Sequence, residues 1–217
     1  ANITGTLHVL EAMREHDVPK IVFASSSSVY AGRDGLLKED NDLAPPHPYG
    51  VGKLAGEHYV RVYQELYGLQ GATLRFFSIY GPYQQGDIEH AAVVAKFVWQ
   101  AHHGKPLTVY GDGTHQRNFT FVDDCVRSIR LAIDSKQAQG EIINIANPVE
   151  VTVNDIVDAI QELGIDVTIT HEPRRQGDPL RNPADTSKAE RILGYVPQVS
   201  LQEGVKRYND WYKEHHD

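Results

Sequence analysis

Tyr49 and Lys53 stand four residues apart in the stretch PHPYGVGKLAGEHY, which covers residues 46–59. In a helix this spacing places the two side chains one turn apart on the same face. A free tyrosine has a pKa of about 10 and is a poor base at neutral pH, but a neighbouring ammonium favours its phenolate form. The pair therefore predicts a tyrosine that removes a proton from a substrate alcohol by general base catalysis.

Glycines in the same stretch suggest a competing interpretation, namely a loop that binds a nucleotide phosphate. The dinucleotide fingerprint has G-x-G-x-x-G spacing between a strand and a helix. Here Gly50, Gly52 and Gly56 have G-x-G-x-x-x-G spacing and follow a proline-rich loop. A Walker loop would need Ser or Thr after Lys53, where the chain has Leu54. We therefore expect the glycines to let a helix pack closely against a neighbour.

The elements that must position these residues alternate between strands and helices. Leu54, His58, Val62 and Leu66 recur at helical spacing and predict a helix from about residue 49 to residue 66. Buried strands are predicted for the apolar runs KIVFASSSS, GATLRFF and EIINIA. This alternation predicts an α/β fold with a parallel sheet covered by helices on both faces. Shorter, mixed elements after residue 81 predict a second, smaller lobe.

The serine-rich end of the first strand is a second chemical signal. Ligands of parallel α/β sheets bind beyond the carboxyl ends of the strands. The ends ASSSS and RFFSIYG are therefore where we expect the site. A serine hydroxyl there can pass a proton from a substrate alcohol to the phenolate of Tyr49.

Composition limits the classes of partner. A net charge of −8 disfavours broad binding to nucleic acid or to an anionic membrane, whereas a phosphorylated small molecule needs only a few cations. The single cysteine, Cys125, excludes an internal disulfide and a cysteine-based zinc site, and the histidines have no third ligand at metal spacing. No apolar run is long enough to span a membrane, and we find no signal peptide. We expect a soluble, cytoplasmic protein.

Five motifs occur in a fixed order: FASSSSVY, PYGVGK, LRFFSIYGP, VYGDGTHQRNFTFVDD, and RRQGD followed by ADTSKAERILGYVP. Together they resemble the extended short-chain dehydrogenase/reductase family, in its NAD-dependent nucleotide-sugar epimerase/dehydratase branch. The resemblance covers essentially the whole chain. It implies a Rossmann-type NAD-binding domain over residues 1–80 with a returning strand near 141–146. It also implies a smaller, mixed lobe over 81–217 that binds the nucleotide sugar.

One departure from the family concerns the start of the fold. The family's N-terminal glycine-rich loop and first strands are missing from this sequence. We therefore expect a fragment, a natural truncation or half of a split enzyme, built on a Rossmann-type parallel sheet that lacks its N-terminal strands.

The resemblance also implies roles for individual residues. It makes Tyr49 the catalytic base, Lys53 the residue that holds the nicotinamide ribose, and Ser26 the catalytic hydroxyl. The implied cofactor-binding residues are Ala24, Ser25, Tyr49, Lys53 and Phe76. The implied substrate-binding residues are Ser26, Ser27, Ser78, Arg117, Arg175 and Asp178. The two arginines would be charge-assisted donors to a diphosphate, and Arg174 is an alternative to Arg175.

Smaller departures from the family discriminate between reactions. Dehydratases of the branch carry an Asp-Glu pair where this chain has Ser27 and Ser28. Ser78 and Asn118 stand where the family usually has Asn and Asp. We expect epimerisation of UDP-glucose and UDP-galactose at C4 through a 4-keto intermediate. The alternatives are a uronate or N-acetylhexosamine epimerase, a reductase, a decarboxylase, or a non-catalytic remnant that binds nucleotide sugars. A homodimer that includes the helix from Tyr49 is the expected assembly.

Overall fold

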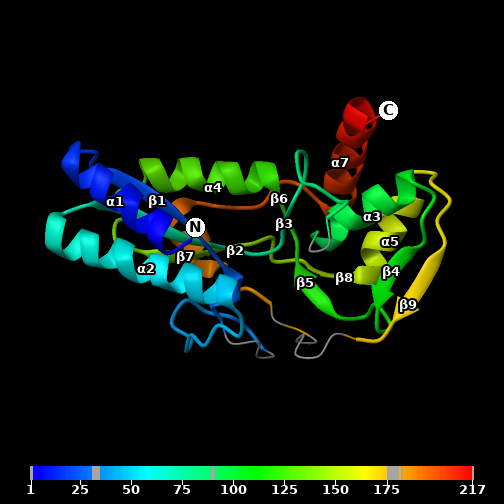
Figure 1. Ribbon diagram of the computed structural model, residues 1–217, viewed down its shortest axis with the longest axis horizontal. Helices are drawn as coiled ribbons and strands as arrows, with labels where there is room; N and C mark the ends of the chain where they lie inside the picture. Colours follow the sequence, from blue (N-terminus) through cyan, green and yellow to red (C-terminus); the bar gives the residue numbers. More distant parts are fainter. Residues whose placement is uncertain (1, 31–34, 89–90, 175–180, 182, 217) are drawn as a thin grey trace.

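A three-stranded parallel sheet forms the centre of the first part of the molecule (Figure 1). The computed structural model describes residues 2–30, 35–88, 91–174, 181 and 183–216. The strand order is β1-β2-β7, with β1 at Lys20–Ser26, β2 at Gln70–Phe76 and β7 at Ile142–Ile145. The register aligns Ser26 with Phe76 and Phe76 with Ile145, so the carboxyl ends of all three strands meet at one edge. The predicted α/β class with a parallel sheet is confirmed.

Helices cover both faces of this sheet. On one face lie α1 (Thr4–Glu15) and α2 (Pro48–Tyr67), and on the other lie α4 (Val122–Asp134) and α6 (Ser187–Leu193) (Figure 1). The first face is packed through Leu10, Met13, Phe23, Val60 and Tyr63. The second is packed through a cluster that includes Leu74, Cys125, Ile143, Ile145 and Leu193. Cys125 is thus a core residue, as we expect of a lone cysteine in a helix.

Helix α2 is fixed at both ends by local signals. Pro48 opens the helix, and the ring of His47 accepts a hydrogen bond from the main-chain nitrogen of Gly50 at 3.3 Å. Gly68 ends the helix in the left-handed conformation, with φ of 69°. The predicted helix is therefore confirmed to within one residue at each end.

The buried face of α2 is not the stripe that its apolar spacing suggests. His58, Val62 and Leu66 are exposed. The buried residues are Gly50, Gly52, Gly56, Glu57, Val60 and Tyr63. Three of the six are glycines, so atoms of the neighbouring elements pack directly on the helix backbone.

Two of these glycines show how close that approach is. A Cβ atom on Gly50 would lie 2.2 Å from the main-chain oxygen of Ser28, and one on Gly56 would lie 2.3 Å from the ring of Phe23. No real Cβ contact is that short, so only glycine fits without movement of a neighbour. The expectation that these glycines serve close helix packing is confirmed.

The second part of the molecule holds α3 (Val93–His102), α5 (Val153–Gln161) and α7 (Leu201–His216), packed around a shared apolar cluster. Its short strands form two-stranded sheets. The pairs are β3 (Ile79–Tyr80) with β6 (Thr120–Phe121), β4 (Leu107–Tyr110) with β9 (Ile169–Glu172), and β5 (Gln116–Asn118) with β8 (Glu150–Thr152). Within the part of the chain that the structure describes, no helix is long and apolar enough to cross a membrane.

Candidate active site

The serine tip, residues 25–28, lies where β1 ends. The 3-10 turn η1 (Ser27–Val29) follows directly, and its first turn is capped by Ser26, whose Oγ accepts a hydrogen bond from the nitrogen of Ser28 at 3.1 Å. Ser25 points the other way, because successive strand residues alternate between faces. Its side chain is buried and donates to Oε1 of Glu57 at 2.5 Å. Ser26 and Ser27 are half-buried, so the tip offers hydroxyls at the surface of the site.

Tyr49 and Lys53 lie on the same face of the first two turns of α2. The ammonium of Lys53 is 5.7 Å from the ring centroid of Tyr49 and donates to the main-chain oxygen of Ala24 at 2.9 Å. It also lies 5.6 Å from the centroid of Phe23, and burial lowers the pKa of Lys53. Tyr49 is 48% exposed. The structure therefore brings a phenol and an ammonium together beside the carboxyl end of β1.

The end of β2 contributes to the same edge of the sheet. Phe76 is buried and pairs in register with Ser26. Two residues later Ser78 has φ of 33°, a left-handed conformation that non-glycine residues seldom adopt. A hydrogen bond of 3.1 Å from the nitrogen of Thr120 to the oxygen of Ser78 holds it there. Such outliers cluster at functional sites, which agrees with the place of Ser78 at the mouth of a cavity.

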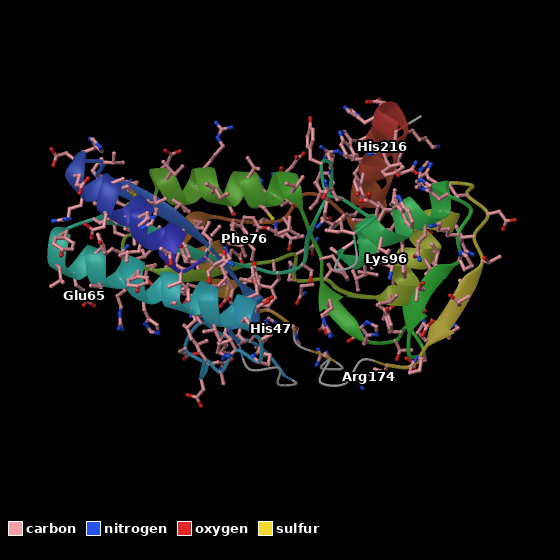
Figure 2. All side chains as sticks on the ribbon, in the orientation of Figure 1. His47, Glu65, Phe76, Lys96, Arg174 and His216 are labelled. Atoms are coloured by element: carbon pink, nitrogen blue, oxygen red, sulfur yellow. The ribbon has the colours of Figure 1, made fainter. Side chains whose placement is uncertain are left out.

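This cavity begins at the end of β2 and extends into the second part of the molecule. Its volume is about 280 Å³. Ser78 and Arg117 both line it, so the structure brings together these two predicted substrate-binding residues. Lys96 of α3 and His115 add further basic groups, and Figure 2 shows Lys96 on its helix. Apolar walls with a few basic side chains are typical of a site for an anionic small molecule.

Asn118, next to Arg117 on β5, is buried, and its side chain hydrogen-bonds to the main chain of neighbouring segments. Its amide nitrogen donates to the main-chain oxygens of Asn147 at 2.8 Å and Val149 at 3.3 Å. Its oxygen accepts from the nitrogen of Ala184 at 2.8 Å. A carboxylate could accept from Ala184 but could not donate to two carbonyls, so the amide suits these partners better than the Asp that is common in the family.

Two predicted residues, Arg175 and Asp178, lie outside the described residues. Their alternative, Arg174, follows β9 and lies in contact distance of Gly111, where a Cβ atom would meet its side chain at 3.6 Å (Figure 2). Among the residues that the structure describes, no group of three or more His, Cys, Asp or Glu side chains could hold a metal ion.

The structure places several residues in or beneath the site that the motifs and their spacing do not predict. In the cavity these are Lys96, Tyr110 and His115. Beneath the site they are Glu57 and Arg75, which form a buried ion pair. The available signal for the pair was an arginine inside an apolar strand, GATLRFF, since a buried arginine requires a partner.

Comparisons with known proteins identify a family and relatives. Residues 1–146 match the NAD dependent epimerase/dehydratase family. The chain is 38% identical over 205 residues to the uncharacterized UDP-glucose epimerase YtcB of Bacillus subtilis, and 35% identical over 219 residues to a UDP-glucuronate 4-epimerase of Thermodesulfobacterium geofontis. These matches cover 94% and 99% of this chain, and 64% and 65% of the two relatives. The chain thus spans somewhat less than two thirds of their length.

A solved structure has the same fold as this chain. The chain superposes on UDP-glucuronic acid 4-epimerase from Bacillus cereus, in complex with UDP-glucuronic acid and NAD, with a TM-score of 0.89. The two share 36% sequence identity, and the match covers 98% of this chain and 67% of that one.

Proposed function

The chain belongs to the NAD-dependent epimerase/dehydratase family, and we propose that it serves the NAD-dependent epimerisation of a nucleotide sugar at C4. UDP-glucose and UDP-galactose are the proposed substrate pair. The observation that carries the proposal is the placement of Tyr49 and Lys53 on one face of α2, with the ammonium bound to the carbonyl of Ala24 at the end of β1.

The nicotinamide end of NAD fits the groups at this edge of the sheet. The donor set there, an ammonium and a phenol beside the exposed Ala24, suits the hydroxyls of a ribose. We assign Tyr49, Lys53, Ala24 and Phe76 to hold this end of the cofactor. Ser25 contributes to the proposed cofactor site indirectly, through its hydrogen bond to Glu57 of α2. When bound, NAD supplies the chemistry of accepting a hydride and returning it.

The proton chemistry is assigned to side chains of this chain. Ser26 lies at the end of β1 and relays the proton of the sugar 4-hydroxyl through Oγ, while Oη of Tyr49 accepts it and later returns it. Lys53 places an ammonium 5.7 Å from the ring centroid of Tyr49. The tip carries no carboxylate at Ser27 or Ser28, which supports epimerisation over dehydration.

The nucleotide part of the substrate is assigned to the cavity that Ser78 and Arg117 line. A guanidinium binds a diphosphate with forked, charge-assisted hydrogen bonds. Ser26 and Ser27 lie at the sugar end in this proposal, and Arg175 and Asp178 remain predicted contacts of the nucleotide.

UDP-glucuronate is a second candidate substrate. The observation in its favour is the similarity to the UDP-glucuronic acid 4-epimerase of Bacillus cereus over 98% of this chain. Epimerisation of either substrate at C4 requires the same proton transfer, so the residues assigned above would act in the same way on both.

The proposed assembly is a homodimer. Helices α1 and α2 expose large apolar side chains, which are Ile3, Val9, Val51, Val62, Leu66 and Tyr67. Exposed apolar surface of this extent favours association with a partner.

The test of the proposed function is turnover by the full-length protein with added NAD. In separate arms we would supply UDP-galactose and UDP-glucuronate and measure their 4-epimers by chromatography. Tyr49→Phe removes the base and is expected to lower kcat by about 10²–10⁴-fold. The matched control is Tyr67→Phe, at an exposed tyrosine of the same helix, which leaves kcat unchanged. Absence of product in both arms, or equal rates for Tyr49→Phe and wild type, would refute the proposal.

A further inference from the structure

A buried ion pair joins the carboxyl end of β2 to α2. Arg75 is 1% exposed and Glu57 is 4% exposed. The guanidinium grips the carboxylate with two hydrogen bonds, from Nε to Oε1 at 2.9 Å and from Nη2 to Oε2 at 2.8 Å. This forked geometry is the strongest form of an arginine–carboxylate contact and allows one orientation of the two groups.

The pair is the centre of a larger hydrogen-bond network. Ser25 of β1 donates to Oε1 of Glu57 at 2.5 Å. Nη1 of Arg75 donates to Oη of Tyr30 at 3.0 Å and to the main-chain oxygen of Glu39 at 3.2 Å. The network therefore links β1, β2 and α2 with the loop that runs from the serine tip to α2.

The network continues to the third strand of the sheet. Tyr30 Oη donates to Oδ1 of Asn144 in β7 at 2.6 Å, and the nitrogen of Asn144 donates to Oε1 of Glu39 at 2.8 Å. Burial opposes the charge of Arg75, but its contacts with Glu57 and Tyr30 outweigh that cost, and the pKa of Arg75 is raised. Every strand of the sheet is thus tied to this one guanidinium.

Stability alone is a weak reason for such an arrangement. The cost of removing two charges from water can exceed their attraction, and well-packed apolar residues often replace a buried pair without loss. What a buried, directional network provides instead is a fixed geometry for the groups that it joins.

The elements that it joins, β1 and α2, carry the residues of the proposed proton transfer. Glu57 lies one helical turn after Lys53 and two turns after Tyr49 on α2, and Ser25 directly precedes Ser26 on β1. We propose that Glu57 and Arg75 are positioning residues, which hold the first turns of α2 in a fixed relation to the serine tip. The proposal rests on the proposed function for its effect on turnover, but its geometric part stands without it.

The geometric part can be tested on the chain alone. The pKa of Lys53 is lowered because α2 holds its ammonium against β1. If the network fixes that contact, its removal lets water reach the ammonium, and the pKa rises toward the usual value of about 10.4. Nuclear magnetic resonance of lysine labelled with ¹³C at Cε, with Lys53→Met to assign the signal, measures this pKa.

Two variants keep the test independent of folding. Glu57→Leu/Arg75→Met removes both charges together, so no buried charge is left unpaired. Ser25→Ala leaves the ion pair intact and cuts only its link to β1. We expect both to raise the pKa of Lys53. The matched control, Arg61→Gln/Glu65→Gln, removes an exposed pair of the same helix and leaves that pKa unchanged.

Turnover supplies the second readout. Misplacement by about 1 Å costs on the order of 10²-fold in rate, so kcat should fall ten- to a hundredfold in both variants, while KM changes little. An unchanged pKa of Lys53 in Ser25→Ala and in the folded double variant would overturn the proposal. An unchanged kcat in both variants would also overturn the proposal. A wild-type chain without turnover would refute the proposed function only, since the titration of Lys53 still decides the positioning role.

Discussion

Gly50→Ala tests whether the close approach of α2 to the serine tip is needed for the site. Gly50 lies next to Tyr49 in the first turn of α2. A methyl group there would lie 2.2 Å from the main-chain oxygen of Ser28 and 2.8 Å from Cβ of Pro45. The main-chain oxygen has no rotamer into which it can move, so either the serine tip or the start of α2 must shift.

The expected loss of stability follows from two opposing effects. Replacement of glycine by alanine within a helix favours folding by at most about 1 kcal/mol. Overpacking costs about 1–3 kcal/mol, and contact with a main-chain atom belongs at the upper end of that range. We therefore expect a net loss of about 2 kcal/mol, which corresponds to a fall in Tm of roughly 4–8 °C for a chain of this size.

Gly5→Ala is the matched control, because it makes the same chemical change in α1 where no atom lies within 4 Å of the added Cβ. It should raise the stability by up to about 1 kcal/mol. Thermal unfolding followed by circular dichroism measures both variants, and kcat for the proposed epimerisation should fall on the order of 10²-fold in Gly50→Ala alone. A Gly50→Ala protein as stable and as active as Gly5→Ala would refute the reasoning.

Two further predictions concern residues outside the proton-transfer site. Burial and the neighbouring Asp124 raise the pKa of Cys125 to about 12. Iodoacetamide at pH 8 should therefore label the native chain more than a thousandfold slower than the urea-unfolded chain, in which the thiol has its usual pKa of about 8.5. Equal labelling rates would contradict this prediction. Asn118→Ala leaves the main-chain nitrogen of Ala184 and the main-chain oxygen of Asn147 without their side-chain partner. Urea titration should show that the free energy of unfolding falls by about 2–4 kcal/mol, the usual cost of such unpaired groups. A fall smaller than that of a surface variant would show that water replaces the amide.

The elements of this fold are predictable because local signals agree with the final packing. The strands at residues 20–26, 70–76 and 142–145 are apolar runs bounded by turns, and the structure contains all three. Thr152 caps α5 through a capping box with Asp155, which the sequence indicates by the polar residues before an amphipathic run. Wherever one side of an element is apolar and its ends carry caps, residue type and spacing suffice.

The orientation of α2 is not predictable in this way. Periodicity favours the face with Val62 and Leu66, yet both are exposed, and the buried face carries Glu57 and three glycines. Hydropathy counts a glutamate as a surface residue, and it has no means of pairing that glutamate with Arg75, which lies 18 positions away. Long-range charge pairing and backbone contact are properties of the folded chain, and a periodicity argument contains neither.

Glycines and a buried ion pair on one helix face are parts of a single arrangement. At Gly50 the backbone of α2 meets the main chain of Ser28, and at Gly56 it packs on the ring of Phe23, so a larger residue at either position would push this stretch of the helix away from the serine tip or from β1. The carboxylate of Glu57 reaches across to β2, where Arg75 fixes its orientation with two hydrogen bonds. An apolar interface of the same area would allow small sliding and rotation, because dispersion contacts have little direction. In the proposed mechanism Tyr49 and Ser26, on two different elements, share one proton. A directional pair on a closely packed helix supplies that fixed geometry, which an apolar contact would not, and the apolar stripe of α2 stays exposed on the opposite side, where we propose that the homodimer forms.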